Sequence, residues 1–170
     1  MRDRLVAWVE DCVVRGDVEL EDTRLSDQVN ERETWTFSDA TLEALDDGRL
    51  VDCPEVDVDR REFHVIQVHG RRGDLERRLR TVEEPVVIEI GPFTVTGSLH
   101  RAPNGPPLAA LFSYLKFLPV TGATIEFRDM GREPVHEEVV LVNRELIAKT
   151  EPLDVRAPGA DEPWEPVPVA

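Results

Sequence analysis

Apolar and polar residues alternate along most of this chain, which is the pattern of strands that bury one face. Residues 5–20 are rich in valine and are interrupted by Glu10-Asp11 and by Gly16, which predicts two strands or one long strand with a bulge. Residues 51–58 contain Pro54 and are expected to form a loop or an edge strand. Strands are also predicted at 34–37, 63–68, 86–99, 123–127 and 138–147.

Two segments have helical spacing instead. Residues 25–30 place Leu25 and Val29 on one face of a short helix. The second segment follows Pro106-Pro107, which suits a first helical turn, and Pro119 is expected to end it. Its apolar stripe at i, i+3, i+4 and i+7 consists of Leu108, Leu111, Phe112 and Leu115.

The second helix and its strand have a fainter copy earlier in the chain. Residues 25–43 superpose on residues 108–126 without a gap, with Ala40-Thr41 on Ala123-Thr124. The preceding strands superpose after a two-residue shift, which places Gly16 on Gly97. Downstream, residues 63–68 align with residues 139–144 after a deletion. Matches in the same order across three blocks predict a tandem duplication.

Short motifs in both copies resemble those of a bacterial family of small β-rich domains of unknown function. The first copy carries Arg24-Leu25-Ser26-Asp27-Gln28-Val29-Asn30, similar to the RLSDxLN motif of that family. The second copy carries an FLPLT-like motif at 117–121 and Val142-Asn143-Arg144. Neither copy has the whole pattern. The resemblance implies a fold and no particular function.

These patterns together predict an α+β, mainly β protein made of two tandem small units. Each unit is expected to be barrel-like with one short helix, and the two are expected to pack as a pseudo-dimer. A unit of about 70 residues buries little apolar surface alone, so packing between units would add stability. The predicted boundaries are a first β-rich repeat at 1–70, an arginine-rich connector at 71–84, a second repeat at 85–150 and an acidic, proline-rich tail at 151–170.

The net charge of -15 argues against general binding to nucleic acid or anionic lipid. Cys12 and Cys53 lack the spacing of a zinc or redox motif, so neither a metal nor another cofactor is expected. The N-terminus is too charged for a signal peptide, and no later run is long and apolar enough for a membrane span. These features predict a cytoplasmic protein with no membrane contact.

No residue is nominated as catalytic, and the chain is not expected to be an enzyme. The carboxylates between Asp52 and Asp59 alternate with apolar residues, which is typical of one solvated strand face. The four histidines have no neighbouring motif partner. An enzyme with its site between the repeats is a third alternative, and it requires His64, His100 or His136 to converge with a carboxylate in a cleft.

Two features are candidates for binding. The charge reverses in the connector, where arginine side chains could bind phosphate or an acidic partner, or could simply pair with nearby carboxylates. Trp164, flanked by Glu162-Pro163 and Glu165, could anchor the tail on this chain or on another. The candidate connector residues are Arg71, Arg72, Arg77, Arg78 and Arg80.

The favoured function is therefore a non-catalytic interaction or regulatory module that recognises another protein. Homo-oligomerisation is also considered. The alternative is a module that binds a small ligand or nucleic acid through the connector arginines, with nucleic acid disfavoured by the overall charge.

Overall fold

Ten antiparallel strands form a single sheet in the computed structural model, which describes residues 1–69 and 80–153. The described residues include one α-helix, α1 (Leu25–Glu31), and the mainly β prediction is confirmed. The described residues also include three short 3-10 turns, η1 (Arg60–Glu62), η3 (Ala109–Phe112) and η4 (Arg144–Leu146). The strands are β1 (Arg2–Trp8), β2 (Cys12–Glu19), β3 (Thr34–Ala44), β4 (Leu50–Asp59), β5 (Val65–Gln67), β6 (Val82–Ile90), β7 (Phe93–Arg101), β8 (Phe117–Phe127), β9 (Val135–Asn143) and β10 (Ile147–Pro152).

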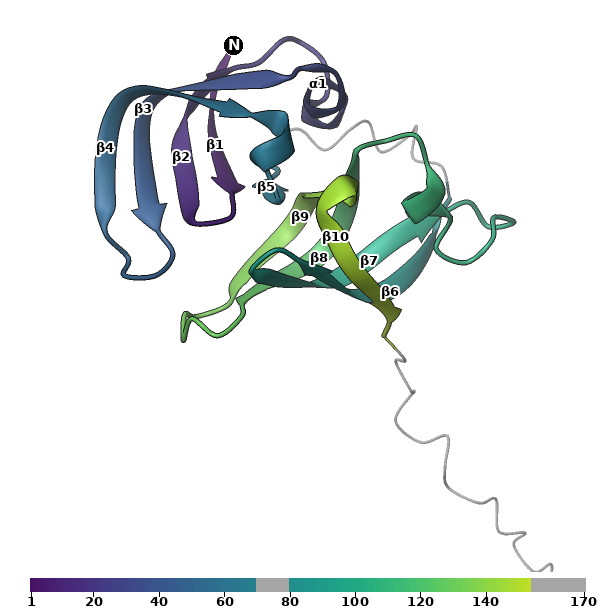
Figure 1. Ribbon diagram of the computed structural model, residues 1–170. Coiled ribbons are helices and arrows are strands. Elements are labelled where there is room, and N and C mark those ends of the chain that lie inside the picture. Colours follow the sequence, from purple (N-terminus) through teal and green to yellow (C-terminus); the bar gives the residue numbers. More distant parts are fainter. Residues whose placement is uncertain (70–79, 154–170) are drawn as a thin grey trace, which may run out of the picture.

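The sheet consists of two halves whose strands follow the same order. The first half reads β5-β1-β2-β3-β4 and the second reads β10-β6-β7-β8-β9. The halves curl into separate lobes and meet where β5 pairs with β9 (Figure 1). Across the described residues the sheet is open, with β10 and β4 as its edges, so the closed barrels suggested by the sequence are not seen.

Irregularities also fall at matching places in the two halves. The register between β2 and β3 shifts around Gly16, and the register between β7 and β8 shifts around Gly97. The gap-free alignment places β3 directly on β8. The strand order disagrees with the third block of the alignment, because 63–68 contain β5 and 139–144 contain the end of β9, and these strands hold different places in their halves. By its place in the order, β9 corresponds to β4.

Two hydrophobic cores lie under the two halves, and each receives side chains from the other half. Trp8 and Leu45 of the first half pack in the core of the second half. Phe117 and Leu141 of the second half pack in the core of the first. Successive side chains of a strand point to opposite faces, so the junction strand β5 sends Val65 into one core and Ile66 into the other. Neither core is built from one half alone.

The second predicted helix is wrong. Only the four residues of η3 form a helical turn, and Leu108 before them has φ of 55°, a left-handed conformation that cannot continue a helix. β8 begins at Phe117, where its pairing with β9 starts, so the residues with helical spacing all lie ahead of the strand. The apolar stripe therefore lies on an irregular segment between β7 and β8.

Pro119 lies inside β8 instead of ending a helix. Proline is rare in central strands because it has no amide hydrogen for the ladder. The pairing of β8 with β7 ends at Thr121 opposite Ser98, whereas the pairing with β9 continues to Phe117. Pro119 is thus in a stretch of β8 that has a strand neighbour on one side only, where a missing amide hydrogen is tolerated.

Candidate functional site

Most residues nominated for binding fall outside the described part of the chain. Arg80 is described and is exposed ahead of β6. The other nominated residues, Arg71, Arg72, Arg77, Arg78 and Trp164, lie outside residues 1–69 and 80–153. Of the nominated residues, Arg80 alone can be placed within the described part of the chain.

Two exposed aromatic side chains stand out on the surface. Phe112 is 83% exposed and Tyr114 is 92% exposed, whereas every other aromatic ring of the described residues is buried. Both belong to the segment 102–116, which joins β7 to β8 and contains η3. We call Phe112 and Tyr114 the aromatic pair. Large apolar rings on a surface are typical of docking sites.

The segment exposes these rings because its other apolar side chains face inward. Leu108, Ala110, Leu111 and Leu115 are partly buried and pack against the core of the second half. Leu111 and Leu115 flank the aromatic pair in sequence. The inward side chains hold the segment on the sheet, and the aromatic pair remains on its outer side.

The start of the segment is fixed by a partly buried ion pair. The Glu84 carboxylate accepts hydrogen bonds from the Leu108 amide at 3.0 and 3.1 Å and from Arg101 Nε at 3.0 Å. Arg101 Nη1 donates to the carbonyl oxygens of Ala102, Pro103 and Gly105 at 3.2, 3.0 and 3.1 Å. A charge-assisted network with this many partners restrains the loop strongly.

The end of the segment is fixed by residues from both halves. Asn30 Oδ1, at the end of α1, accepts hydrogen bonds from the amides of Lys116 at 2.7 Å and Phe117 at 3.1 Å. Arg144 Nη1 donates to the Leu111 carbonyl oxygen at 3.3 Å, and the Arg144 amide donates to the Lys116 carbonyl oxygen at 2.7 Å. The aromatic pair is therefore presented by a pre-organised segment, which lowers the ordering cost of binding.

The surroundings of the aromatic pair are depleted in acidic residues. The chain has 35 acidic residues, yet none occurs between Glu89 and Glu126, a stretch that includes β7, η3 and most of β8. Arg101 and Lys116 lie in this stretch. The segment itself therefore presents no carboxylate to a ligand, and Glu84, which contacts it, is paired with Arg101.

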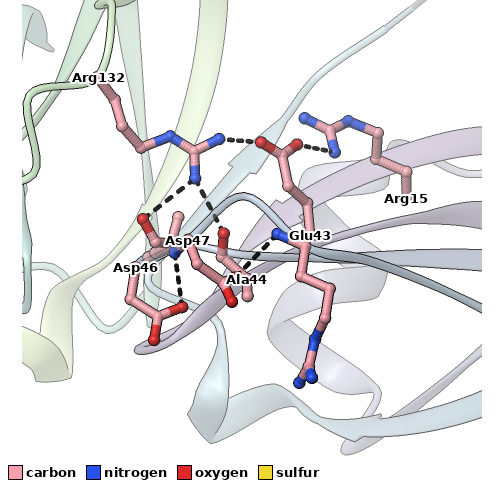
Figure 2. Close-up of polar contacts among 8 residues, drawn as sticks. Arg15, Glu43, Ala44, Asp46, Asp47 and Arg132 are labelled. Atoms are coloured by element: carbon pink, nitrogen blue, oxygen red, sulfur yellow. Dashed lines mark hydrogen bonds and ion pairs between the residues drawn. The ribbon is translucent and has the colours of Figure 1, made fainter.

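A second polar cluster joins the two halves (Figure 2). Arg132, from the loop between β8 and β9, forms an ion pair with Glu43 of β3 and donates to the carbonyl oxygens of Ala44 and Leu45 at 3.2 and 3.4 Å. Glu43 also pairs with Arg15 of β2 at 2.6 Å. Figure 2 shows the Glu43 carboxylate between the two guanidinium groups.

The two arginines keep Glu43 ionised. Burial by itself would raise the pKa of this carboxyl group, but hydrogen bonds and charges from Arg15 and Arg132 outweigh burial and lower its pKa. A carboxylate held between two cations is poorly suited to accept or donate a proton near neutral pH. This cluster is therefore a structural link between the halves.

His64 lies beside a carboxylate. Its Nε2 lies 2.9 Å from Glu10 Oε2, and its ring packs edge-on against Phe93 with centroids 5.8 Å apart. A Cβ atom at Gly91 would lie 2.4 Å from the ring, so the histidine is tightly enclosed by the turn between β6 and β7. His64 is thus buried between hairpins of the two halves.

His100 and His136 bond to hydroxyl groups on separate strands. His100 lies between Thr81 and Thr121, at 3.1 and 2.7 Å, and His136 Nδ1 lies 2.9 Å from Thr124 Oγ1. The described histidines do not converge on one site. Within residues 1–69 and 80–153, no group of three or more His, Cys, Asp or Glu side chains could hold a metal ion.

The aromatic pair was missed by reasoning from the sequence. The helical spacing assigned Phe112 to a core-facing stripe, and Tyr114 was not singled out. The absence of acidic residues between Glu89 and Glu126 is the sequence signal that could have drawn attention to this surface.

Comparisons with known proteins add no further identification. No family model, no curated protein and no solved structure was found to match this chain. In the described part of the chain, no helix is long and apolar enough to cross a membrane.

Proposed function

We propose that this chain is a non-catalytic cytoplasmic interaction module that binds another protein through the aromatic pair Phe112 and Tyr114. The observation that supports this proposal is the near-complete exposure of two aromatic rings on a segment anchored at both ends. Aromatic side chains contribute much of the binding free energy at protein interfaces. Their pre-organisation means that little conformational entropy is lost when a partner binds.

We further propose that the two halves are tandem copies of the small β-rich unit whose motifs the sequence resembles, packed as a pseudo-dimer. The shared strand order and the matching register shifts around Gly16 and Gly97 support this proposal. In this arrangement η3 takes the place of α1. The first copy uses that place to contact the second through Asn30, while the second copy presents the aromatic pair.

Site-specific photocrosslinking tests the proposed surface in the full chain. A photoreactive phenylalanine analogue would replace Phe112 or Tyr114 in cells of the source organism, with Leu50 as the control position because it is 63% exposed on the edge strand β4. The expected result is a common crosslinked protein from positions 112 and 114 that is absent from position 50.

Binding of that protein, once purified, provides the quantitative test. The double substitution Phe112→Ser with Tyr114→Ser should weaken the measured affinity at least tenfold, or about 1.4 kcal/mol, whereas Leu50→Ser should leave it within about twofold. Equal binding by the wild type and the double variant would show that the aromatic pair is not the docking surface. Crosslinks from position 50 alone would also show that the aromatic pair is not the docking surface.

A further inference from the structure

The described chain ends beside the segment that carries the aromatic pair. β10 pairs with β6, and the Leu153 amide donates to the Pro85 carbonyl oxygen at 2.8 Å. The preceding residue of β6 is Glu84, whose carboxylate accepts a hydrogen bond from the Leu108 amide at 3.0 Å. The chain therefore leaves the sheet next to the anchor of the segment 102–116.

The length of chain beyond Leu153 is sufficient to reach the aromatic pair. Trp164 lies 11 residues after Leu153, a length that can span up to about 36 Å. The η3 turn between Leu108 and Phe112 covers only about 8 Å. Trp164 can therefore reach Phe112 and Tyr114 without displacing β10.

The composition of the last residues complements this surface. Trp164 is surrounded in sequence by acidic residues and prolines, namely Asp161, Glu162, Pro163, Glu165 and Pro166. The stretch between Glu89 and Glu126 has no acidic residue and contains Arg101 and Lys116. An acidic segment is repelled over most of this chain, whose net charge is -15, whereas this stretch adds no acidic residue of its own and the carboxylate bound to it, Glu84, is paired with Arg101.

We propose that residues 154–170 dock on the aromatic pair of the same chain, with Trp164 as the anchor. This inference rests on the proposed function, because it names the regulation of the same surface. A tethered segment acts at an effective concentration in the millimolar range, so even a weak contact would be occupied. A partner protein then binds only by displacing this segment, and the last residues of the chain set the affinity for the partner.

Fluorine NMR of the full chain labelled with 5-fluorotryptophan tests this docking. Trp8 and Trp35 are buried, so Trp164 is the one tryptophan whose environment the proposal makes dependent on the aromatic pair. The Trp164 resonance is assigned with Trp164→Phe. It should differ from that of a synthetic peptide of residues 154–170 and should move to the peptide position in the Phe112→Ser, Tyr114→Ser variant. Leu50→Ser should leave it unchanged.

Three outcomes would overturn the proposal. A Trp164 resonance at the peptide position in the wild type would show that the tail does not dock. A Trp164 resonance that differs from the peptide position but does not change in the Phe112→Ser, Tyr114→Ser variant would place the contact elsewhere. A difference between the Trp164 resonance and the peptide position that grows with protein concentration would show that a second copy supplies the segment.

Partner binding distinguishes failure of this inference from failure of the proposed function. If the tail competes, Trp164→Ser should raise the affinity for the crosslinked partner at least threefold, while Phe112→Ser with Tyr114→Ser lowers it. An unchanged affinity in Trp164→Ser, together with loss in the double variant, would overturn autoinhibition and leave the docking surface intact.

Discussion

Glu43 of β3 and Arg132 of the loop between β8 and β9 form an ion pair although they are 89 positions apart in the sequence (Figure 2). The pair connects the hairpin of one half to a loop of the other. Leu45, whose carbonyl oxygen also accepts a hydrogen bond from Arg132, packs in the core of the second half. Polar and apolar contacts therefore coincide at this end of the junction.

Replacing Glu43 tests the contribution of this link to stability. We expect Glu43→Gln to reduce the free energy of unfolding by about 1–3 kcal/mol at pH 7, because two charged donors lose their carboxylate. Urea denaturation of the full chain measures the change. The matched control is Glu19→Gln, since Glu19 lies 4.0 Å from Arg2 in a mostly exposed pair and should contribute less than about 0.5 kcal/mol.

The same pair gives a pH dependence with a defined sign. The pKa of Glu43 is lowered in the folded state, so its stabilising effect is complete above the pKa of the unfolded state and is lost as pH falls through the folded pKa. The stability difference between wild type and Glu43→Gln should therefore shrink below about pH 4. A difference in unfolding free energy that stays constant down to pH 2 would contradict a stabilising role for the ionised Glu43 carboxylate.

Asn30 should contribute strongly to the junction despite its place in a short surface helix. Asn30→Ala leaves the amides of Lys116 and Phe117 without their acceptor, and we expect a loss of about 2–4 kcal/mol in unfolding free energy. Asn30→Asp keeps an acceptor oxygen and should cost less. Equal losses for the two variants would mean that the acceptor oxygen is not what stabilises the junction.

Glycine is required more strictly at the second bulge than at the first. A Cβ atom at Gly97 would lie 2.6 Å from Val120 Cγ1 and 2.8 Å from the Thr121 carbonyl oxygen, whereas at Gly16 the nearest atom would be 3.0 Å away. We expect Gly97→Ala to destabilise the protein by about 1–3 kcal/mol and Gly16→Ala by less. Thermal denaturation ranks the two variants, and the reverse ranking would show that the second bulge relaxes more easily than the first.

Charged side chains on β10 should prevent the edge of the sheet from pairing. Val65 of β5 is buried where it pairs with β9, whereas Lys149 and Glu151 of the corresponding strand β10 are exposed on an open edge. We expect Lys149→Val with Glu151→Val to increase association at equal protein concentration, as measured by analytical ultracentrifugation. Lys149→Arg with Glu151→Asp is the charge-preserving control, and unchanged sedimentation of the valine variant would refute a protective role.

Cys12 should react slowly with alkylating reagents. Burial, together with the charge and hydrogen bond of Asp11, raises the pKa of the Cys12 thiol to about 11. At pH 8 its thiolate fraction is on the order of 200-fold below that of a free cysteine. In a Cys53→Ser variant, iodoacetamide modification should accelerate about tenfold per pH unit up to pH 9.5. A plateau near pH 8.5 would contradict this prediction.

The strands could largely be predicted, because each depends on local alternation of apolar and polar residues. Residues 34–44 and 117–127 form equal-length strands at the positions that the gap-free alignment indicates. The edge position of β4 also agrees with Pro54 in its sequence. The second helix could not be predicted correctly, because the segment 102–116 is held by long-range contacts, such as that of Glu84 with the Leu108 amide, which local spacing does not contain.

The candidate site could not be predicted for a related reason. Whether Phe112 belongs to a core or to a surface depends on the backbone conformation of Leu108 and on the anchoring of the segment by Glu84. The contact between Glu84 and the Leu108 amide joins residues 24 positions apart in the sequence. Helical spacing alone assigned Phe112 to the wrong side.

The sequence by itself determined the strand-forming segments, the acidic character and the internal similarity, since these follow from composition and short-range periodicity. Only the tertiary structure decided that β5 pairs with β9, that each core takes side chains from both halves, and that the aromatic pair remains exposed. Strand pairing and burial depend on contacts between distant parts of the chain. Alternation shows which side chains share a face of a strand. The pairing of that strand with its neighbours decides whether the face is buried, and in which of the two cores.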